Sequence, residues 1–184
     1  MNIFDKIRLF FLNRSIRKEL RYVQRKKQLF NLEQAKTLGV VYNAGTENDF
    51  ERAGSLIRHL QSKNKIVKSI GFVPFKELPH YTTTKLNFDY ITLKDLNWYW
   101  KPKPAFVEDF KKAEFDVLID LNLTGNQSLR YIVELSRAKF KIGLYRDDSK
   151  DVYDFMLEGI EPGKVSLFIK EVLHYLEIFK TKES

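Results

Sequence analysis

From residue 38 onward, the sequence alternates short apolar segments with longer segments of helical periodicity. Strands are predicted at residues 38–42, 66–73, 88–93, 115–121 and 140–145, and helices at 46–62, 104–113, 126–138 and 162–179. Strands that alternate with helices favour a parallel sheet covered on both faces, and right-handed crossovers leave few strand orders. We therefore expect an α/β fold with a five-stranded, mostly parallel, Rossmann-like doubly wound sheet in the order 3-2-1-4-5.

The N-terminal segment differs from this pattern in charge and composition. Residues 1–37 contain ten Lys/Arg and three Asp/Glu, so this segment holds seven of the eight net positive charges of the chain. Residues 2–35 contain neither glycine nor proline, and apolar residues repeat at helical spacing from Leu9 to Leu20. We predict a basic amphipathic helical extension over residues 1–37, followed by one Rossmann-like α/β domain over residues 38–184.

The cations of this extension are the candidate site residues. Clustered positive charge attracts polyanions, either nucleic-acid phosphates or an anionic membrane surface. Seven residues form the candidate RNA- or lipid-binding set: Arg14, Arg17, Lys18, Arg21, Arg25, Lys26 and Lys27. RNA, in particular the ribosome, is the partner expected first, because cations are dense on the helix while the body adds little net charge. In the alternative, the apolar stripe packs on the body and the cations are only solvated.

An anionic membrane surface is the second partner that the same helix would fit. Phe4, Ile7, Phe10 and Phe11 lie near its start, where they would insert among lipids while the cations meet the headgroups. A second aromatic segment, Trp98–Trp100, stands beside lysines and prolines. Aromatic residues next to cations stack on bases or lie at a bilayer interface. Large aromatics most often supply buried area, however, so we expect two of these three to close the edge of the core.

Two turns after predicted strands carry polar residues at the sheet edge where ligands bind in parallel α/β folds. Asn43 follows the first strand, and the turn after the fourth strand adds Asp120, Asn122, Thr124 and Ser128. These residues form a possible ligand loop, and a second alternative function is therefore an enzyme or a sensor that binds a nucleotide or a sugar nucleotide there. Each turn has a single glycine and the chain has no phosphate-binding glycine motif, so we predict no cofactor and do not expect a small-molecule ligand.

Several classes of chemistry lack their usual residues in this chain. There is no cysteine, and His59, His80 and His174 form no metal-binding pattern, so neither a disulfide nor a metal site is expected. No serine has the context of a nucleophile elbow, and we name no catalytic residue. No apolar run approaches the about 20 residues that a membrane-spanning helix needs. We expect a non-enzymatic binding protein of the cytoplasm, either free or peripheral to the inner face of the membrane.

Two resemblances rest on longer stretches of sequence. Residues 115–122, with Ser128 and residues 135–143, resemble the N-terminal half of heptosyltransferase-type, two-domain glycosyltransferases. This resemblance implies a Rossmann-like fold but supports catalysis poorly, because such enzymes bind the donor nucleotide mainly through their C-terminal half. The chain as a whole resembles an uncharacterised protein family of Bacteroidota, through residues 70–74, 88–92, 96–102 and 115–122. The second resemblance implies kinship without an activity.

Overall fold

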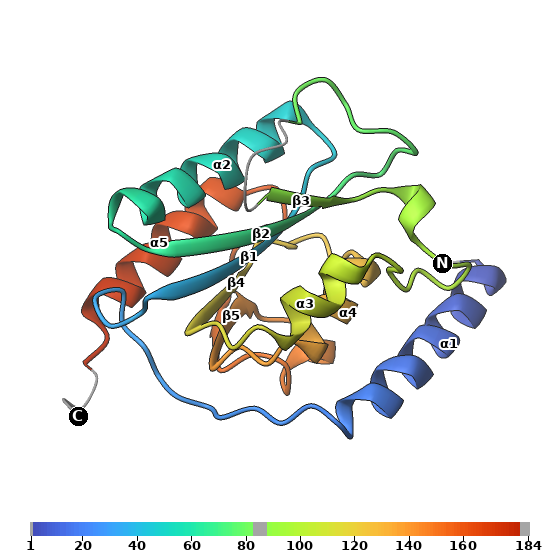
Figure 1. The fold of residues 1–184 in the computed structure, drawn as a ribbon, viewed down its shortest axis with the longest axis horizontal. Coiled ribbons are helices and arrows are strands. Elements are labelled where there is room, and N and C mark those ends of the chain that lie inside the picture. Colours follow the sequence, from blue (N-terminus) through green and yellow to red (C-terminus); the bar gives the residue numbers. More distant parts are fainter. Residues whose placement is uncertain (1, 83–87, 181–184) are drawn as a thin grey trace.

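The chain folds around a parallel β-sheet (Figure 1). The structure, a computed structural model, describes residues 2–82 and 88–180. Within these residues, six strands pair in the order β3-β2-β1-β4-β5-β6, and every pair is parallel. Their bounds are β1 (Thr37–Asn43), β2 (Ile66–Phe72), β3 (Phe88–Ile91), β4 (Val117–Asp120), β5 (Phe140–Leu144) and β6 (Phe155–Leu157). The predicted order of the first five strands is confirmed, but the prediction of a five-stranded sheet was wrong.

Helices cover both faces of this sheet, as strands buried on both sides require. The pair on one face is α2 (Glu47–Ser62) and α5 (Val165–Ile178), and the pair on the other is α3 (Ala105–Lys112) and α4 (Gln127–Leu135) (Figure 1). Successive strand residues point to opposite faces, so Val40 packs in the α2/α5 core and Val41 in the α3/α4 core. The alternation of strand and helix thus gives the two-sided sheet that the sequence predicted.

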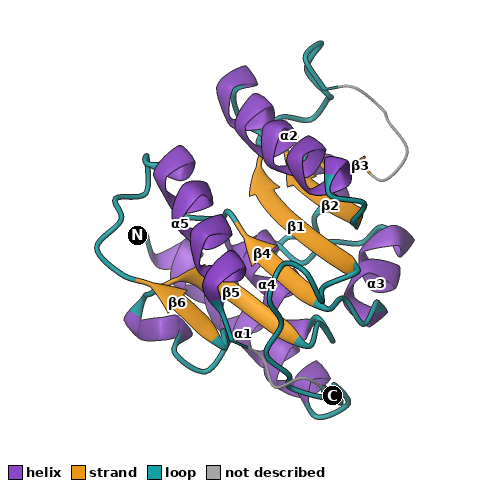
Figure 2. Cartoon of the chain, turned by 90° about the vertical axis from the view of Figure 1, so that its left-hand side faces the viewer, coloured by secondary structure: helices purple, strands orange, loops and turns teal. Residues whose placement is uncertain are grey.

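The strand that the sequence analysis missed, β6, pairs with β5 at the edge of the sheet (Figure 2). It has three residues, which are too few for an alternating apolar pattern to identify. Gly143 on β5 lies against the ring of Tyr153, just before β6, and a Cβ at this glycine would stand 2.3 Å from a ring carbon. The missing side chain at residue 143 therefore makes room for the segment that leads into β6.

The N-terminal helix, α1 (Ile3–Leu20), is shorter than the predicted one. It packs across α4 and buries Leu12 and Ile16 in the α3/α4 core (Figure 1). The prediction of a helix over residues 2–35 was wrong for its second half. The predicted amphipathic character is not confirmed, because apolar side chains occur on the outer face of α1 as well as on the inner one.

Residues 22–36, which we call the strap, connect α1 and its C-cap residue Arg21 to β1 (Figure 1). The strap crosses from the α3/α4 side of the sheet to the α2/α5 side, where Phe30 and Leu32 are buried in the core. Its backbone also bonds to the domain, since the N–H of Leu32 donates to the carbonyl of Leu176 at 2.7 Å. These tertiary contacts outweigh helix propensity, which explains why α1 ends although no glycine or proline follows it.

Candidate anion-binding surface

The outer face of the C-terminal end of α1 carries four exposed cations, which we call the cationic cluster: Arg14, Arg17, Lys18 and Arg21. Arg14 and Arg17 are three residues apart, as are Lys18 and Arg21, and each residue of the first pair lies four residues before one of the second pair, so the four lie on one side of the helix. Among the residues that the structure describes, none of the four has a hydrogen-bond or ion-pair partner, and Lys26 in the strap is also exposed. Like charges this close repel one another, so an anion that bridges them is favoured.

Two other cations of the predicted set are held by the fold. Arg25 is largely buried in the strap, where it donates to the backbone carbonyls of Ala138 and Lys139. Its guanidinium also pairs with the carboxylate of Asp154. Lys27 Nζ lies 3.5 Å from the same carboxylate, although most of its side chain is exposed. Arg25 is therefore an internal contact, and the structure separates it from the cationic cluster.

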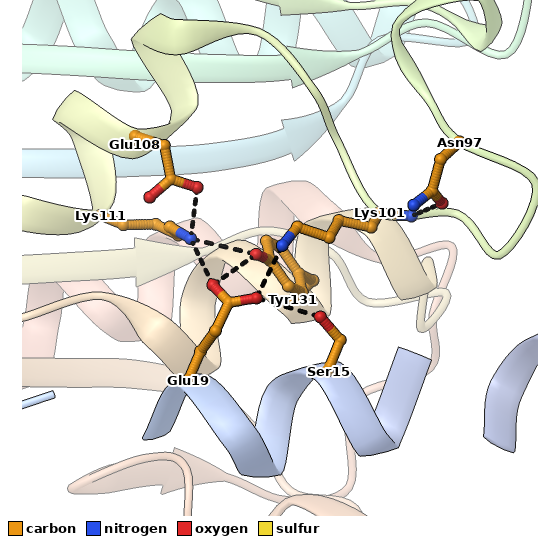
Figure 3. A network of polar contacts seen from close by, with 7 residues as sticks. All are labelled: Ser15, Glu19, Asn97, Lys101, Glu108, Lys111 and Tyr131. Atoms are coloured by element: carbon orange, nitrogen blue, oxygen red, sulfur yellow. Dashed lines mark hydrogen bonds and ion pairs between the residues drawn. The ribbon is translucent and has the colours of Figure 1, made fainter. Parts of the chain in front are cut away.

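A polar network fixes α1 against α3 and α4 (Figure 3). The Glu19 carboxylate accepts hydrogen bonds from Lys101 Nζ and from the Tyr131 hydroxyl, each at 2.7 Å. Lys111 Nζ lies 3.2 Å from this carboxylate and 2.7 Å from that of Glu108. Burial acts to raise the pKa of Glu19, but the hydrogen bonds and the lysine charges outweigh it and lower the pKa to about 2. The ionised Glu19 thus fixes the rotation of α1, which turns the cationic cluster outward.

Aromatic side chains fix the N-terminal end of α1. Phe11 packs edge-on against Trp98 with the ring centroids 4.9 Å apart, and Trp98 packs edge-on against Tyr99 at 5.2 Å. The Arg8 guanidinium lies 5.5 Å from the centroid of the Trp100 ring. Tyr99 and Trp100 are half-buried and Trp98 is exposed. Two of these three aromatics are thus withdrawn from solvent beside α1, and the third remains accessible.

At the carboxyl ends of β1 and β4, three residues of the predicted ligand loop come together. Asn43 Nδ2 donates to Asn122 Oδ1 at 3.2 Å and to Thr124 Oγ1 at 3.1 Å. The two strands flank the point where the strand order reverses, the usual ligand position in such sheets. The cavity there, which Asp49 and Arg52 also line, measures about 120 Å³. Ligand pockets usually begin at roughly 300 Å³, so its size disfavours a nucleotide or a sugar nucleotide.

Asp120 and Ser128, the other residues of the predicted ligand loop, are buried and bonded within the fold. The Asp120 carboxylate accepts hydrogen bonds from the Tyr153 hydroxyl at 2.5 Å and from the backbone N–H of Asn122 at 2.8 Å. Burial raises the pKa of Asp120 despite these bonds. The Ser128 hydroxyl donates to the carbonyl of Trp100 at 2.9 Å. Both side chains therefore contribute to the fold, and neither lies beside Asn43 in the cavity.

The sequence analysis did not name Ile3 among the apolar residues at the start of α1, and it named Trp98 without predicting that this one of the three aromatics stays exposed. Helical spacing could have identified Ile3, because Ile7 and Phe10 follow it by four and seven residues. The exposure of Trp98 depends on how its loop packs against α1, and no local pattern reports such packing.

Within the described residues, no group of three or more His, Asp or Glu side chains is arranged to hold a metal ion. None of the described helices combines the length and the apolar character that crossing a bilayer takes.

A comparison with known protein families matches residues 8–179 to one family model. The chain belongs to DUF6913, a family of unknown function. The predicted kinship with an uncharacterised family is thereby confirmed. The part of the chain that matches DUF6913 includes the cationic cluster and the strap.

No curated protein matches the chain. Among solved structures, it is similar to an exopolyphosphatase-related protein from Bacteroides fragilis, with 19% sequence identity and a TM-score of 0.44. The similarity covers 78% of this chain and 42% of that protein, so the chain spans less than half of that protein's length. The match to DUF6913 gives no support to the resemblance of residues 115–143 to glycosyltransferases. Membership of DUF6913 therefore assigns a family without assigning an activity.

Proposed function

We propose that this protein is a binding module that attaches to a phosphate-bearing polyanion through the cationic cluster of α1. The observation that carries the proposal is the exposure of all four cations on one outer face, without a partner among the described residues. RNA, with the ribosome first, and an anionic lipid surface both present phosphates at a density that such a cluster fits. The proposed function is defined by this shared chemistry and includes no catalytic step.

The fixed position of α1 supports this proposal. Glu19 and the aromatic contacts of Phe11 hold the helix before any partner arrives, so binding orders only the cationic side chains. Each Lys or Arg near an anionic surface contributes about 1 kcal/mol at modest salt. Four such contacts give about 4 kcal/mol, which corresponds to a Kd of about 1 mM. The cluster alone thus supports weak attachment, and tighter binding requires further contacts.

The salt dependence of binding tests the proposed function. The full chain is titrated with a single-stranded RNA oligonucleotide and with vesicles that contain phosphatidylglycerol. We expect binding to at least one of these probes, with an affinity that falls steeply as the salt concentration rises. For RNA, four phosphate contacts predict a slope of log K against log salt of about −3, because about 0.7 counterions are released per contact. Binding that does not change between low and high salt contradicts the proposal.

A charge-reversal variant identifies the surface that binds. Replacing all four residues of the cationic cluster by Glu should lower the affinity at least about 100-fold, because every attraction becomes a repulsion. The matched control makes the same net charge change on the α2/α5 side of the sheet, at the exposed residues Arg58, Lys63, Lys164 and Lys170. We expect the control to lose only a few-fold. Equal losses in the two variants would mean that the cluster has no special role.

A further inference from the structure

Just before the cationic cluster, α1 exposes large apolar side chains. Ile3, Phe4 and Phe10 are 70%, 69% and 63% exposed, and Ile7 is 44% exposed. Trp98, in the loop beside this end of the helix, is 56% exposed. We call these five residues the apolar end of α1. Large apolar side chains that gather in this way on a surface mark a docking site.

The apolar end and the cationic cluster lie along one outward stripe of the helix. Ile3, Ile7, Phe10, Arg14 and Arg17 follow one another at intervals of three or four residues, which places them on the same side. The 18 residues of α1 span about 27 Å. A flat partner laid along this stripe therefore meets apolar side chains over its first half and positive charge over its second half.

This arrangement favours a lipid surface over RNA. An RNA strand offers phosphates to the cations and bases to aromatic rings, but it offers nothing to the aliphatic side chains of Ile3 and Ile7. A bilayer interface accommodates all three kinds of side chain. Apolar residues enter the acyl boundary, tryptophan lies at headgroup level, and Arg and Lys face anionic phosphates.

Resting on the proposed function, we infer that the partner is an anionic phospholipid surface on which α1 lies in the plane of the interface. The apolar end inserts at the acyl boundary, and the cationic cluster binds the headgroups. Phe11 packs against Trp98, so the loop that carries Trp98 enters the lipid interface together with α1. The cationic cluster alone supports only weak attachment, and insertion of the apolar end into the acyl boundary supplies the further contacts that tight attachment requires.

Vesicle binding by the full chain tests this inference. One set of vesicles contains phosphatidylcholine alone, and the other contains about 30% phosphatidylglycerol. Of the two tryptophans of the chain, Trp98 belongs to the apolar end and Trp100 lies against Arg8 of α1, so tryptophan emission reports on insertion of this end of the helix. We expect co-sedimentation and a blue shift of the emission with phosphatidylglycerol vesicles, and neither effect with phosphatidylcholine alone. An RNA oligonucleotide at the same salt concentration is the parallel probe.

Replacing exposed apolar residues separates insertion from charge attraction. Combining Phe4→Ser, Ile7→Ser and Phe10→Ser should weaken vesicle binding at least about tenfold and should weaken any RNA binding less, because RNA makes no use of Ile7. The matched control replaces exposed apolar residues elsewhere on the surface by Ser: Ile66, Leu167 and Ile178. All six side chains are exposed, so both variants should fold, which circular dichroism checks. We expect the control to bind vesicles like the natural chain.

The outcomes distinguish the inference from the proposed function. Binding to RNA without binding to vesicles overturns the inference and leaves the proposed function standing. Binding to neither probe overturns both. Full vesicle binding by the Phe4, Ile7 and Phe10 variant overturns the insertion of the apolar end, and equal binding to uncharged vesicles overturns the role of anionic headgroups.

Discussion

Two groups of N-terminal cations follow one another in the sequence and have opposite roles. The cationic cluster of α1 faces solvent without a partner among the described residues, whereas Arg25 is largely buried against Asp154 and two backbone carbonyls. Similar residues at similar local charge density thus give a free surface in one case and a structural contact in the other. Net charge locates the segment, but acidic residues far along the chain decide which of its cations are available.

The largest expected effect on stability separates these two groups directly. Arg25→Ala leaves Asp154 without its closest counterion, and breaking a largely buried pair costs about 3 kcal/mol of unfolding free energy. Arg17→Ala removes an exposed cation and should cost less than about 0.5 kcal/mol. Urea unfolding of both variants measures the difference. Equal small losses would show that Arg25 is as free as Arg17 and would break the comparison.

A smaller effect is expected at Glu19, the acid that fixes α1. Glu19→Gln removes the charge that Lys101 and Lys111 face, and should cost about 2 kcal/mol because hydrogen bonds to a charged group are lost or weakened. The folded-state pKa of Glu19 is lowered from 4.5 to about 2. Its contribution to stability is therefore complete above about pH 4.5 and is lost as the pH falls toward 2.

Acid unfolding and hydrogen exchange check the role of Glu19. The Gln variant should lose stability less steeply than the natural chain between about pH 4.5 and 2, because its side chain does not titrate. Amide exchange should accelerate in α1 before it does so in the strands of the sheet. Superimposable acid-unfolding curves for the two proteins would exclude Glu19 as the ionised centre of the network.

A separate effect, confined to alkaline pH, concerns a third kind of cation, Lys141, which is buried near Arg25. Burial, with a further contribution from the charge of Arg25, lowers the pKa of Lys141 from 10.5 to about 7. The unfolded chain keeps this proton up to about pH 10.5, so the group adds stability as the pH rises from about 7 to 10.5. Lys141→Met should remove that rise. Thermal melts of both proteins across this range measure it, and identical pH dependence would argue against a neutral Lys141.

The central strands were predictable because their signal is local. β1 and β4 are buried on both faces, so most of their residues are apolar and the run stands out from its surroundings. Because the predicted strands alternate with predicted helices, a parallel sheet and its strand order could then be predicted. The edge strand β6 has no comparable signal, since its three residues are defined by pairing with β5 and by the room that Gly143 leaves for Tyr153.

The candidate surface was predictable only where side chains point away from the protein. The spacing of Arg14, Lys18, Arg21 and Arg25 indicates a shared face, and the structure keeps the first three of these exposed. The burial of Arg25 was not predictable, because its partner Asp154 lies 129 residues further along the chain. The same reason explains the end of α1, which is set by contacts of the strap with distant residues and by no residue within the strap itself.

The strap and α1 also determine when the protein can finish folding. Their partners, among them Tyr131, Asp154 and Leu176, lie more than 100 residues further along the chain. The inner face of α1, with Leu12 and Ile16, therefore lacks α4, the helix that it packs against, until that helix has been made. Such long sequence separations slow the final closure and leave apolar surface exposed in the nascent chain. The helix and strap that precede the sheet in the sequence are thus among the last segments to reach their native positions.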